Sequence, residues 1–218
     1  MAAIRGVLFD LDGTLADTAP DLAYALNAVL LEQSRQALAY EQIRPNVSLG
    51  SGGLIELGFR INKQDANYEV FRQRLLDIYA EHVCDHTVLF PGMADVLTAL
   101  DERALPWGIV TNKIGYLTQA VVQKLGLADR TNCVVAADST PTPKPHPAPV
   151  LLACNLLKLA PASCLFIGDD LRDILAGRAA GTINLVARYG YLGAGEDPDQ
   201  WGADGHLSKP ADILDWLN

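Results

Sequence analysis

Short apolar runs that end in polar residues recur along the chain. Five of them span four to six residues each and lack the regular alternation of apolar and polar positions that marks a half-exposed strand: 4–9, 107–110, 133–137, 164–167 and 183–187. Such runs are typical of strands buried on both faces, as in a parallel sheet covered by helices. We therefore expect five strands of one parallel sheet.

Helical patterns lie between these runs. Val96, Leu97 and Leu100 have helical spacing before the second run, and residues 117–125 carry an apolar face before the third. Gly126 stands where that second helix would end. The alternation of strands and helices predicts an α/β protein with a Rossmann-like, doubly wound parallel sheet.

The interval 18–85 breaks this alternation, because it has helical patterns and no clear strand. Thr18 begins a segment typical of a helix start, with a hydroxyl cap followed by Pro20 and an acid. A second helix is expected around Phe71 and Ile78, whereas the glycine-rich segment 48–53 is expected to be irregular. We infer an α-helical cap domain at 18–85, inserted into a core domain formed by 1–17 and 86–218.

Charge narrows the range of partners. The 218 residues include 17 Lys and Arg against 26 Asp and Glu, a net charge of −9. An acidic chain without a basic cluster argues against nucleic acid and anionic membranes as partners. No stretch approaches the roughly 18 apolar residues of a membrane span, and no signal peptide pattern opens the chain. We expect a cytoplasmic monomer or homodimer.

Polar residues follow several of the predicted strands. Asp10 and Asp12 come directly after the first run, and alternate residues of a strand share a face, so the two carboxyl groups can converge. Thr111, Lys144 and Asp169 stand at or just beyond other strand ends. Ligands of open α/β sheets bind at the carboxyl ends of the strands. We therefore expect these five side chains to meet at one site.

The acids in this set require a counter-charge. Asp170 and Asp173 follow Asp169 closely, so five acids are expected near one another. Like charges about 4 Å apart repel by roughly 4 kcal/mol even at an effective dielectric constant of about 20, which calls for protonation or a cation. Mg²⁺ fits best, because it takes a few carboxylate oxygens and also contacts substrate phosphate.

Taken together, these segments resemble the four motifs of the haloacid dehalogenase superfamily: Asp10-x-Asp12-x-Thr14, Thr111 after a strand, Lys144 before Pro145, and Gly168-Asp169-x-x-x-Asp173. The resemblance covers essentially the whole chain. The place of the helical insert is similar to the C1 cap of the phosphoglycolate phosphatase branch. The segments 110–113, 188–191 and 201–204 resemble most closely the N-acetylmuramic acid 6-phosphate phosphatases of that branch.

The resemblance implies a role for each acid. Asp10 would be the nucleophile that forms an aspartyl-phosphate. Asp12 would protonate the leaving alcohol and then deprotonate the attacking water. Asp10, the backbone carbonyl of Asp12 and Asp169 would hold Mg²⁺, while Asp170 and Asp173 would shape the metal site without binding the ion.

The resemblance also implies how substrate is held. Thr111, Asn112 and Lys144 would bind the phosphoryl group. The substrate would be a small phosphorylated metabolite, with N-acetylmuramic acid 6-phosphate and 2-phosphoglycolate as the best candidates. Arg44, Ser51 and Gly52 in the cap are expected to contact its leaving group.

Two other functions remain open at this point. A phosphosugar mutase of the same superfamily would share every catalytic residue. A non-catalytic phosphate-binding or receiver-like module would also cluster acids and a lysine around one aspartate. The second acid, Asp12, and the long insert favour a phosphatase over both a dehalogenase and a receiver.

Overall fold

The computed structural model describes residues 3–193 and 197–217. Its main sheet has six strands in the order β5-β4-β1-β6-β7-β8, and every neighbouring pair is parallel. The predicted fold class is confirmed, and each of the five apolar runs forms a strand. The strands are β1 (Gly6–Phe9), β4 (Trp107–Val110), β5 (Cys133–Val135), β6 (Cys164–Gly168), β7 (Ile183–Ala187) and β8 (Gly205–Leu207).

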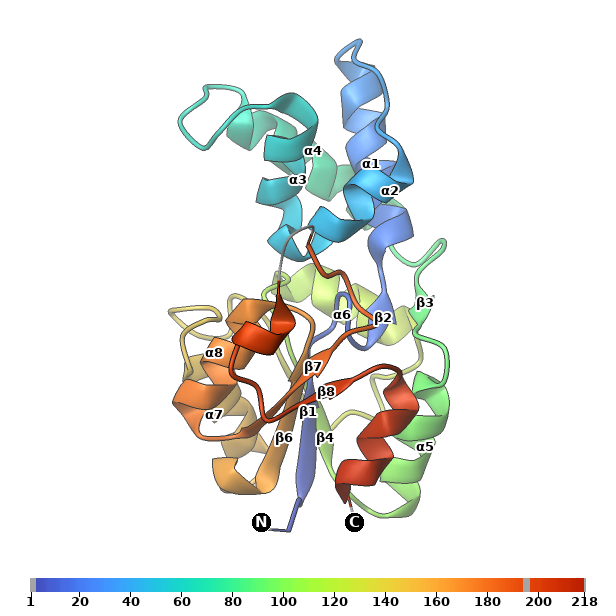
Figure 1. Cartoon of the computed structure of the whole chain (residues 1–218). Helices are drawn as coiled ribbons and strands as arrows, with labels where there is room; N and C mark the ends of the chain where they lie inside the picture. The colour runs from blue at the N-terminus through green and yellow to red at the C-terminus, as the bar shows by residue number, and fades with distance from the viewer. Residues whose placement is uncertain (1–2, 194–196, 218) are drawn as a thin grey trace.

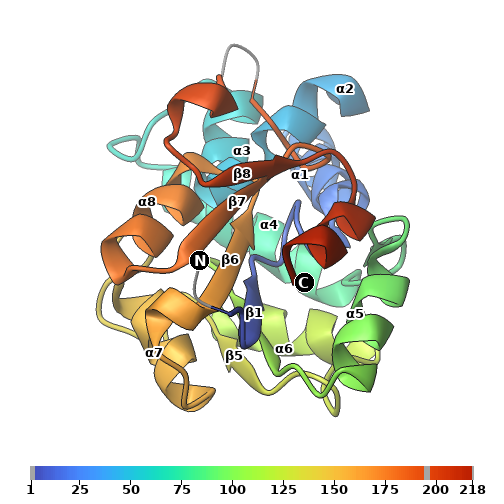
Figure 2. The ribbon, with the colours of Figure 1, turned by 60° about the horizontal axis from the view of Figure 1, so that its bottom comes forward.

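Helices cover both faces of this sheet. In Figures 1 and 2, α7 and α8 lie on one face, and α5, α6 and the C-terminal 3₁₀ helix lie on the other. The residues of β1 between them have no exposed surface, as expected of a central strand in a doubly wound sheet. These elements are α5 (Met93–Glu102), α6 (Gly115–Lys124), α7 (Ala148–Leu156), α8 (Leu171–Ala180) and the 3₁₀ helices η2 (Pro161–Ser163), η3 (Pro198–Gln200) and η4 (Pro210–Leu217).

A helical body stands over one end of the sheet (Figure 1). Its elements are α1 (Ala19–Glu32), α2 (Tyr40–Ile43), the 3₁₀ helix η1 (Arg44–Leu49), α3 (Gly50–Phe59) and α4 (Tyr68–Glu81). Buried side chains of α1 and α4, such as Leu26 and Leu75, belong to the same apolar cluster as Phe9 of the sheet. No helix among the described residues is long and apolar enough to cross a bilayer.

Two short strands connect the helical body to the sheet. β2 (Ala16–Asp17) leads into α1, and β3 (Val88–Leu89) follows α4. They pair antiparallel, with Ala16 opposite Leu89. The chain therefore enters and leaves the helical body through adjacent backbones.

The segment 48–53 is helical, so the prediction that it would be irregular is wrong. η1 runs to Leu49 and α3 begins at Gly50. Tight packing explains Gly52, where a Cβ would lie 2.5 Å from the hydroxyl of Tyr68, whereas Gly50 has a φ of +71° and marks the break between the two helices. Tertiary packing here outweighs the poor helix propensity of glycine.

Candidate active site

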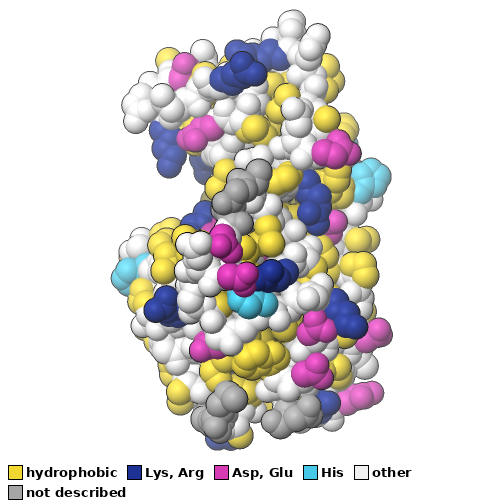
Figure 3. Space-filling model, in the orientation of Figure 1, with side chains coloured by type: hydrophobic (Ala, Val, Ile, Leu, Met, Phe, Trp, Pro, Cys, Tyr) yellow, Lys and Arg dark blue, Asp and Glu magenta, His cyan; other side chains and the backbone are white. Residues whose placement is uncertain are grey.

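A cavity of about 810 Å³ lies between the helical body and the ends of the strands. Figure 3 shows the surface hollowed at the left, between the upper and lower parts of the molecule. Core residues Asp10, Asp12, Thr111 and Lys144 line the cavity from one side, and helical residues 48–53 line it from the other.

Three buried acids form a compact cluster beside the cavity. One carboxylate oxygen each of Asp10, Asp169 and Asp173 lies within 4.8 Å of the other two. β1 and β6 are neighbours in the sheet, so Asp10 and Asp169 follow adjacent strand ends, and Asp173 lies in the first turn of α8. The Lys144 ammonium bridges the cluster, 2.9 Å from Asp10 Oδ1 and 2.6 Å from Asp173 Oδ1.

The electrostatics of the cluster fit a divalent cation. Burial raises the pKa of Asp10 and raises that of Asp169 further, with repulsion from the neighbouring acids adding to both. Three carboxylates face the one ammonium of Lys144, which leaves an excess of two negative charges when all are ionised. Apart from its ion pair with Lys144, the buried Asp10 Oδ1 accepts no hydrogen bond from any described residue. A hard cation with oxygen ligands would supply a further partner.

Asp169 is held in place from three directions. Thr14 Oγ1 donates to Oδ1 at 2.9 Å, while Ser48 Oγ and the backbone N–H of Tyr191 donate to Oδ2 at 3.1 and 2.9 Å. Ser48 belongs to the helical body, so this acid also receives a contact across the cavity. Thr14 and Tyr191 belong to segments that carry the family resemblance, but the sequence alone predicts no role for them.

The two acids predicted to lie outside the metal site differ from each other. Asp173 joins the cluster, but Lys144 occupies its Oδ1, and its Oδ2 accepts the Asp170 N–H at 3.2 Å. Asp170 is the N-cap of α8 and pairs with the Arg172 guanidinium at 2.7 Å. Burial alone would raise the pKa of Asp170, yet the hydrogen bonds and charge of Arg172 outweigh burial and lower it.

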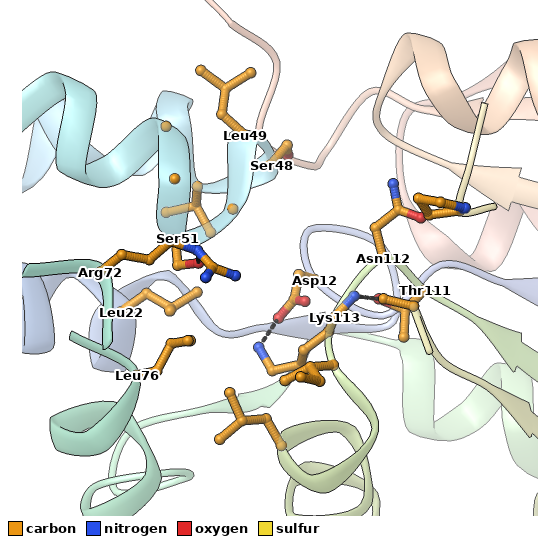
Figure 4. A pocket seen from close by; sticks show the side chains of 18 of the residues that line it. Asp12, Leu22, Ser48, Leu49, Ser51, Arg72, Leu76, Thr111, Asn112 and Lys113 are labelled. Carbon is orange, nitrogen blue, oxygen red and sulfur yellow. Dashed lines mark hydrogen bonds and ion pairs between the residues drawn. The ribbon is translucent and has the colours of Figure 1, made fainter. Parts of the chain in front are cut away.

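Asp12 lines the same cavity as Asp10 and has two donors of its own. Lys113 Nζ is 2.8 Å from Asp12 Oδ1 (Figure 4). Thr18 Oγ1 donates to the same oxygen at 2.6 Å. Thr18 makes no side-chain cap to α1, so that prediction is wrong, because its hydroxyl is engaged with Asp12. Burial would lower the pKa of Lys113, but the Asp12 carboxylate outweighs it and raises the pKa.

The predicted phosphate-binding residues divide into two groups. Thr111 and Lys144 both line the cavity and are buried. Asn112 also lines it, but its side chain donates to the Lys144 carbonyl at 2.9 Å and accepts the Lys144 N–H at 3.0 Å. The Asn112 carboxamide therefore holds the Lys144 backbone with one N–H and its oxygen, and its contact with phosphate stays a prediction.

The three helical residues that were predicted to contact the leaving group also fall into two groups. Ser51 and Gly52 line the cavity, whereas Arg44 does not. The Arg44 guanidinium donates to the Gly190 carbonyl at 3.2 Å and lies over the ring of Tyr191, so it joins the helical body to the core. One cationic side chain of the helical body that points into the cavity is Arg72 of α4, whose Nε donates to Ser51 Oγ at 3.1 Å (Figure 4) and which also pairs with Glu69 at 3.1 Å.

Comparisons with known proteins identify the family. The family described as "Haloacid dehalogenase-like hydrolase" matches residues 7–187. The N-acetylmuramic acid 6-phosphate phosphatase of Pseudomonas putida is 40% identical over 96% of this chain and 94% of its own length. The phosphoglycolate phosphatase of Xanthomonas campestris pv. campestris is 38% identical, over 96% and 94%.

A solved structure is similar over its full length. The crystal structure of a "predicted phosphoglycolate phosphatase" from Haemophilus somnus 129pt has a TM-score of 0.86 and 27% identity, and the match covers 100% of each chain. The resemblance seen in the four motifs is therefore confirmed.

Proposed function

Because this chain belongs to the haloacid dehalogenase-like hydrolases and is a phosphatase, we propose that it hydrolyses phosphomonoesters through an aspartyl-phosphate on Asp10. The single observation that carries this mechanism is the buried Asp10 carboxylate, paired with Lys144 and facing the cavity next to Asp12. An acid so placed can attack phosphorus while a second acid serves the leaving group.

The reaction divides into two displacements. In the first, an Asp10 oxygen forms a bond to phosphorus as the ester P–O bond breaks, and Asp12 gives its proton to the leaving alkoxide. In the second, Asp12 takes a proton from water as the water oxygen bonds to phosphorus and the Asp10–phosphorus bond breaks. Thr111 and Lys144 hold the phosphoryl oxygens during both steps, and Lys144 balances their charge.

We assign the metal as Mg²⁺, held by Asp10, the backbone carbonyl of Asp12 and Asp169. The excess negative charge of the acid cluster supports this assignment, as does Asp10 Oδ1, whose one partner among the described residues is the Lys144 ammonium. When bound, the ion neutralises charge on the transferring phosphoryl group. Lys144 and Asp173 remain paired beside it and keep Asp10 oriented.

The substrate that we propose is a small phosphorylated metabolite with a carboxylate in its leaving group. N-acetylmuramic acid 6-phosphate and 2-phosphoglycolate both have this feature, and relatives named for each share 38–40% of their residues with this chain. Arg72 is placed to pair with such a carboxylate, together with Ser51, and a cavity of about 810 Å³ has room for a sugar. The receiver-like and mutase alternatives have no comparable support.

For the setting of the reaction we propose the cytoplasm, with the protein a monomer or homodimer. Four free cysteines, three of them buried, suit a reducing compartment. Every side chain of the proposed site comes from one chain, so a monomer would be complete and a homodimer would carry two independent sites.

Replacing Asp10 tests the mechanism. We expect Asp10→Asn to lower kcat on para-nitrophenyl phosphate by about 10⁴-fold or more, because an amide cannot form the phospho-enzyme. Asp129→Asn, at an exposed position, is the matched control and should retain wild-type kcat. Substantial turnover by Asp10→Asn, with circular dichroism unchanged, would rule out the aspartyl-phosphate.

A further inference from the structure

Asp12 is held on one side only. Both of its described donors, Lys113 Nζ and Thr18 Oγ1, bind Oδ1. Among the described residues Oδ2 has no hydrogen-bond partner, and the side chain lines the cavity. This asymmetry fixes the carboxyl group with one oxygen anchored and the other turned to where a substrate would lie.

Lys113 reaches Asp12 from a fixed base. Its backbone N–H donates to Thr111 Oγ1 at 3.1 Å, and its carbonyl accepts from the backbone of Ala137 at 3.0 Å and from Thr118 Oγ1 at 3.1 Å. Its side chain is 7% exposed. A lysine anchored at both ends has little freedom to move, in contrast to a solvated lysine on a loop.

A residue of the helical body also contacts Lys113. The ring centroid of Tyr79 in α4 lies 4.4 Å from Lys113 Nζ, within the range of a cation–π contact. Tyr79 has no exposed surface, and its hydroxyl has no hydrogen-bond partner among the described residues. The ring lies against Lys113 Nζ, and the charge of Lys113 also acts on the hydroxyl.

We propose that Lys113 is a positioning residue that holds Asp12 Oδ1 so that Oδ2 faces the leaving-group oxygen, and that Tyr79 makes this arrangement depend on the seated helical cap. The inference rests on the proposed function, because it uses the assigned role of Asp12 in proton transfer. It assigns Lys113 a role that acts through Asp12, and it links cap position to proton delivery.

The test separates positioning from a purely structural role by varying the leaving group. A good leaving group such as para-nitrophenolate needs little help from an acid, whereas phenolate and alkoxides need a proton as the ester bond breaks. The parameter kcat/KM reports the steps up to that bond cleavage. Lys113→Met should therefore lose about tenfold or more activity on phenyl phosphate beyond any loss on para-nitrophenyl phosphate.

Three further variants sharpen the result. Tyr79→Leu removes the ring and should shift the same ratio in the same direction, by a smaller factor. Tyr79→Phe keeps the ring and should keep the wild-type ratio. Lys209→Met removes an exposed lysine far along the chain and serves as the control for lost surface charge.

Equal losses on both esters, or no loss on either, in Lys113→Met would overturn the inference. If Lys113→Met does not fold, as judged by its melting curve, Tyr79→Leu decides, because it leaves the Asp12 ion pair intact. A ratio unchanged in Tyr79→Leu would then reject the link to the cap and with it the proposal. Failure of the aspartyl-phosphate mechanism is separate, since only an active Asp10→Asn would signal it.

Discussion

Gly13 occupies the sharpest turn of the site, between Asp12 and the side chain of Asp169. Its φ is +87°, in the left-handed region, and a Cβ at this position would overlap the Asp169 carboxylate. Only glycine allows both the turn and the close approach of the acid. The residue thus sets the distance between the first strand and the proposed metal ligand.

Gly13→Ala should therefore disturb both stability and the metal site. The left-handed backbone alone costs about 1–2 kcal/mol, and displacement of Asp169 should weaken Mg²⁺ affinity by at least tenfold, measured by activity against free Mg²⁺. Gly126→Ala is the matched control, because Gly126 has φ +69° and no atom lies within 4 Å of the place that a Cβ would take. Gly126→Ala should also be destabilised, but its activity should depend on Mg²⁺ concentration as in the wild type. Equal Mg²⁺ dependence of Gly13→Ala and Gly126→Ala would contradict the assignment of Asp169 as a metal ligand.

The sequence predicts the site residues that directly follow a strand. It does not predict those whose role depends on contacts with residues distant in the chain. Asp10 and Asp169 can be found because each follows an apolar run. Lys113 lies 101 positions from its partner Asp12, and nothing in its local pattern reveals the pair. The contacts of Arg44 with Gly190 and of Asn112 with Lys144 escape prediction for the same reason, since the partners are remote in the chain.

Among the elements, α4 forms the cap wall of the cavity. Its residues Tyr68, Arg72, Leu76 and Tyr79 line the cavity and recur every three or four positions, so one helical face is turned to the site. Arg74 lies off that face and pairs with Glu32 at 2.7 Å on the surface. The helix therefore places one cation at the cavity and another against its neighbour α1.

Because Arg72 lines the cavity and Arg74 does not, replacing each arginine in turn tests substrate recognition. Arg72→Gln should raise KM for 2-phosphoglycolate and N-acetylmuramic acid 6-phosphate by about tenfold, the loss of roughly 1.4 kcal/mol, because it removes the partner of the carboxylate. KM for phenyl phosphate, whose leaving group is uncharged, should stay unchanged. Arg74→Gln should leave KM unchanged for all three substrates. An equal rise in KM for all three with Arg72→Gln would show that Arg72 does not bind the substrate carboxylate.

Elements were predictable where one periodicity dominated. The buried strands and the helices 96–100 and 117–125 follow their patterns closely, and Gly126 does end its helix. β8 escaped prediction because only Leu207 of its three residues is buried, and a pair of two-residue strands such as β2 and β3 leaves no periodicity to detect.

Across the whole molecule, the acid cluster couples stability to pH and to metal. Burial raises the pKa of Asp173 from its ordinary 3.8 to about 7, and the pKa values of Asp10 and Asp169 are raised for the same reason. An acid with a raised pKa in the folded state binds its proton more tightly when folded than when unfolded. Its contribution to the free energy of unfolding is therefore fully present at pH values below its ordinary pKa. That contribution is lost as the pH rises through its pKa in the folded protein.

Because of this cluster, the free energy of unfolding of the metal-free protein should fall by on the order of a few kcal/mol as the pH rises from about 4 to about 7. Lys144 stays protonated throughout, because its pKa is raised by Asp10 and Asp173. Urea unfolding of wild type and Asp169→Asn over this range isolates the effect, which should be smaller in the variant. Saturating Mg²⁺ should restore about 2.7 kcal/mol at 100 times Kd in wild type only; equal gains in both proteins would refute the metal assignment.

The pairing of β2 with β3 has an evolutionary consequence. Since the two crossing strands are held side by side, with Ala16 opposite Leu89, everything between them can be lengthened, shortened or exchanged without moving the ends of the sheet. The helical body can then differ between relatives while the sheet stays the same, provided that contacts such as Tyr79 to Lys113 and Ser48 to Asp169 are kept. A chimera that grafts residues 18–87 of one relative onto the sheet of another is the experimental form of that history.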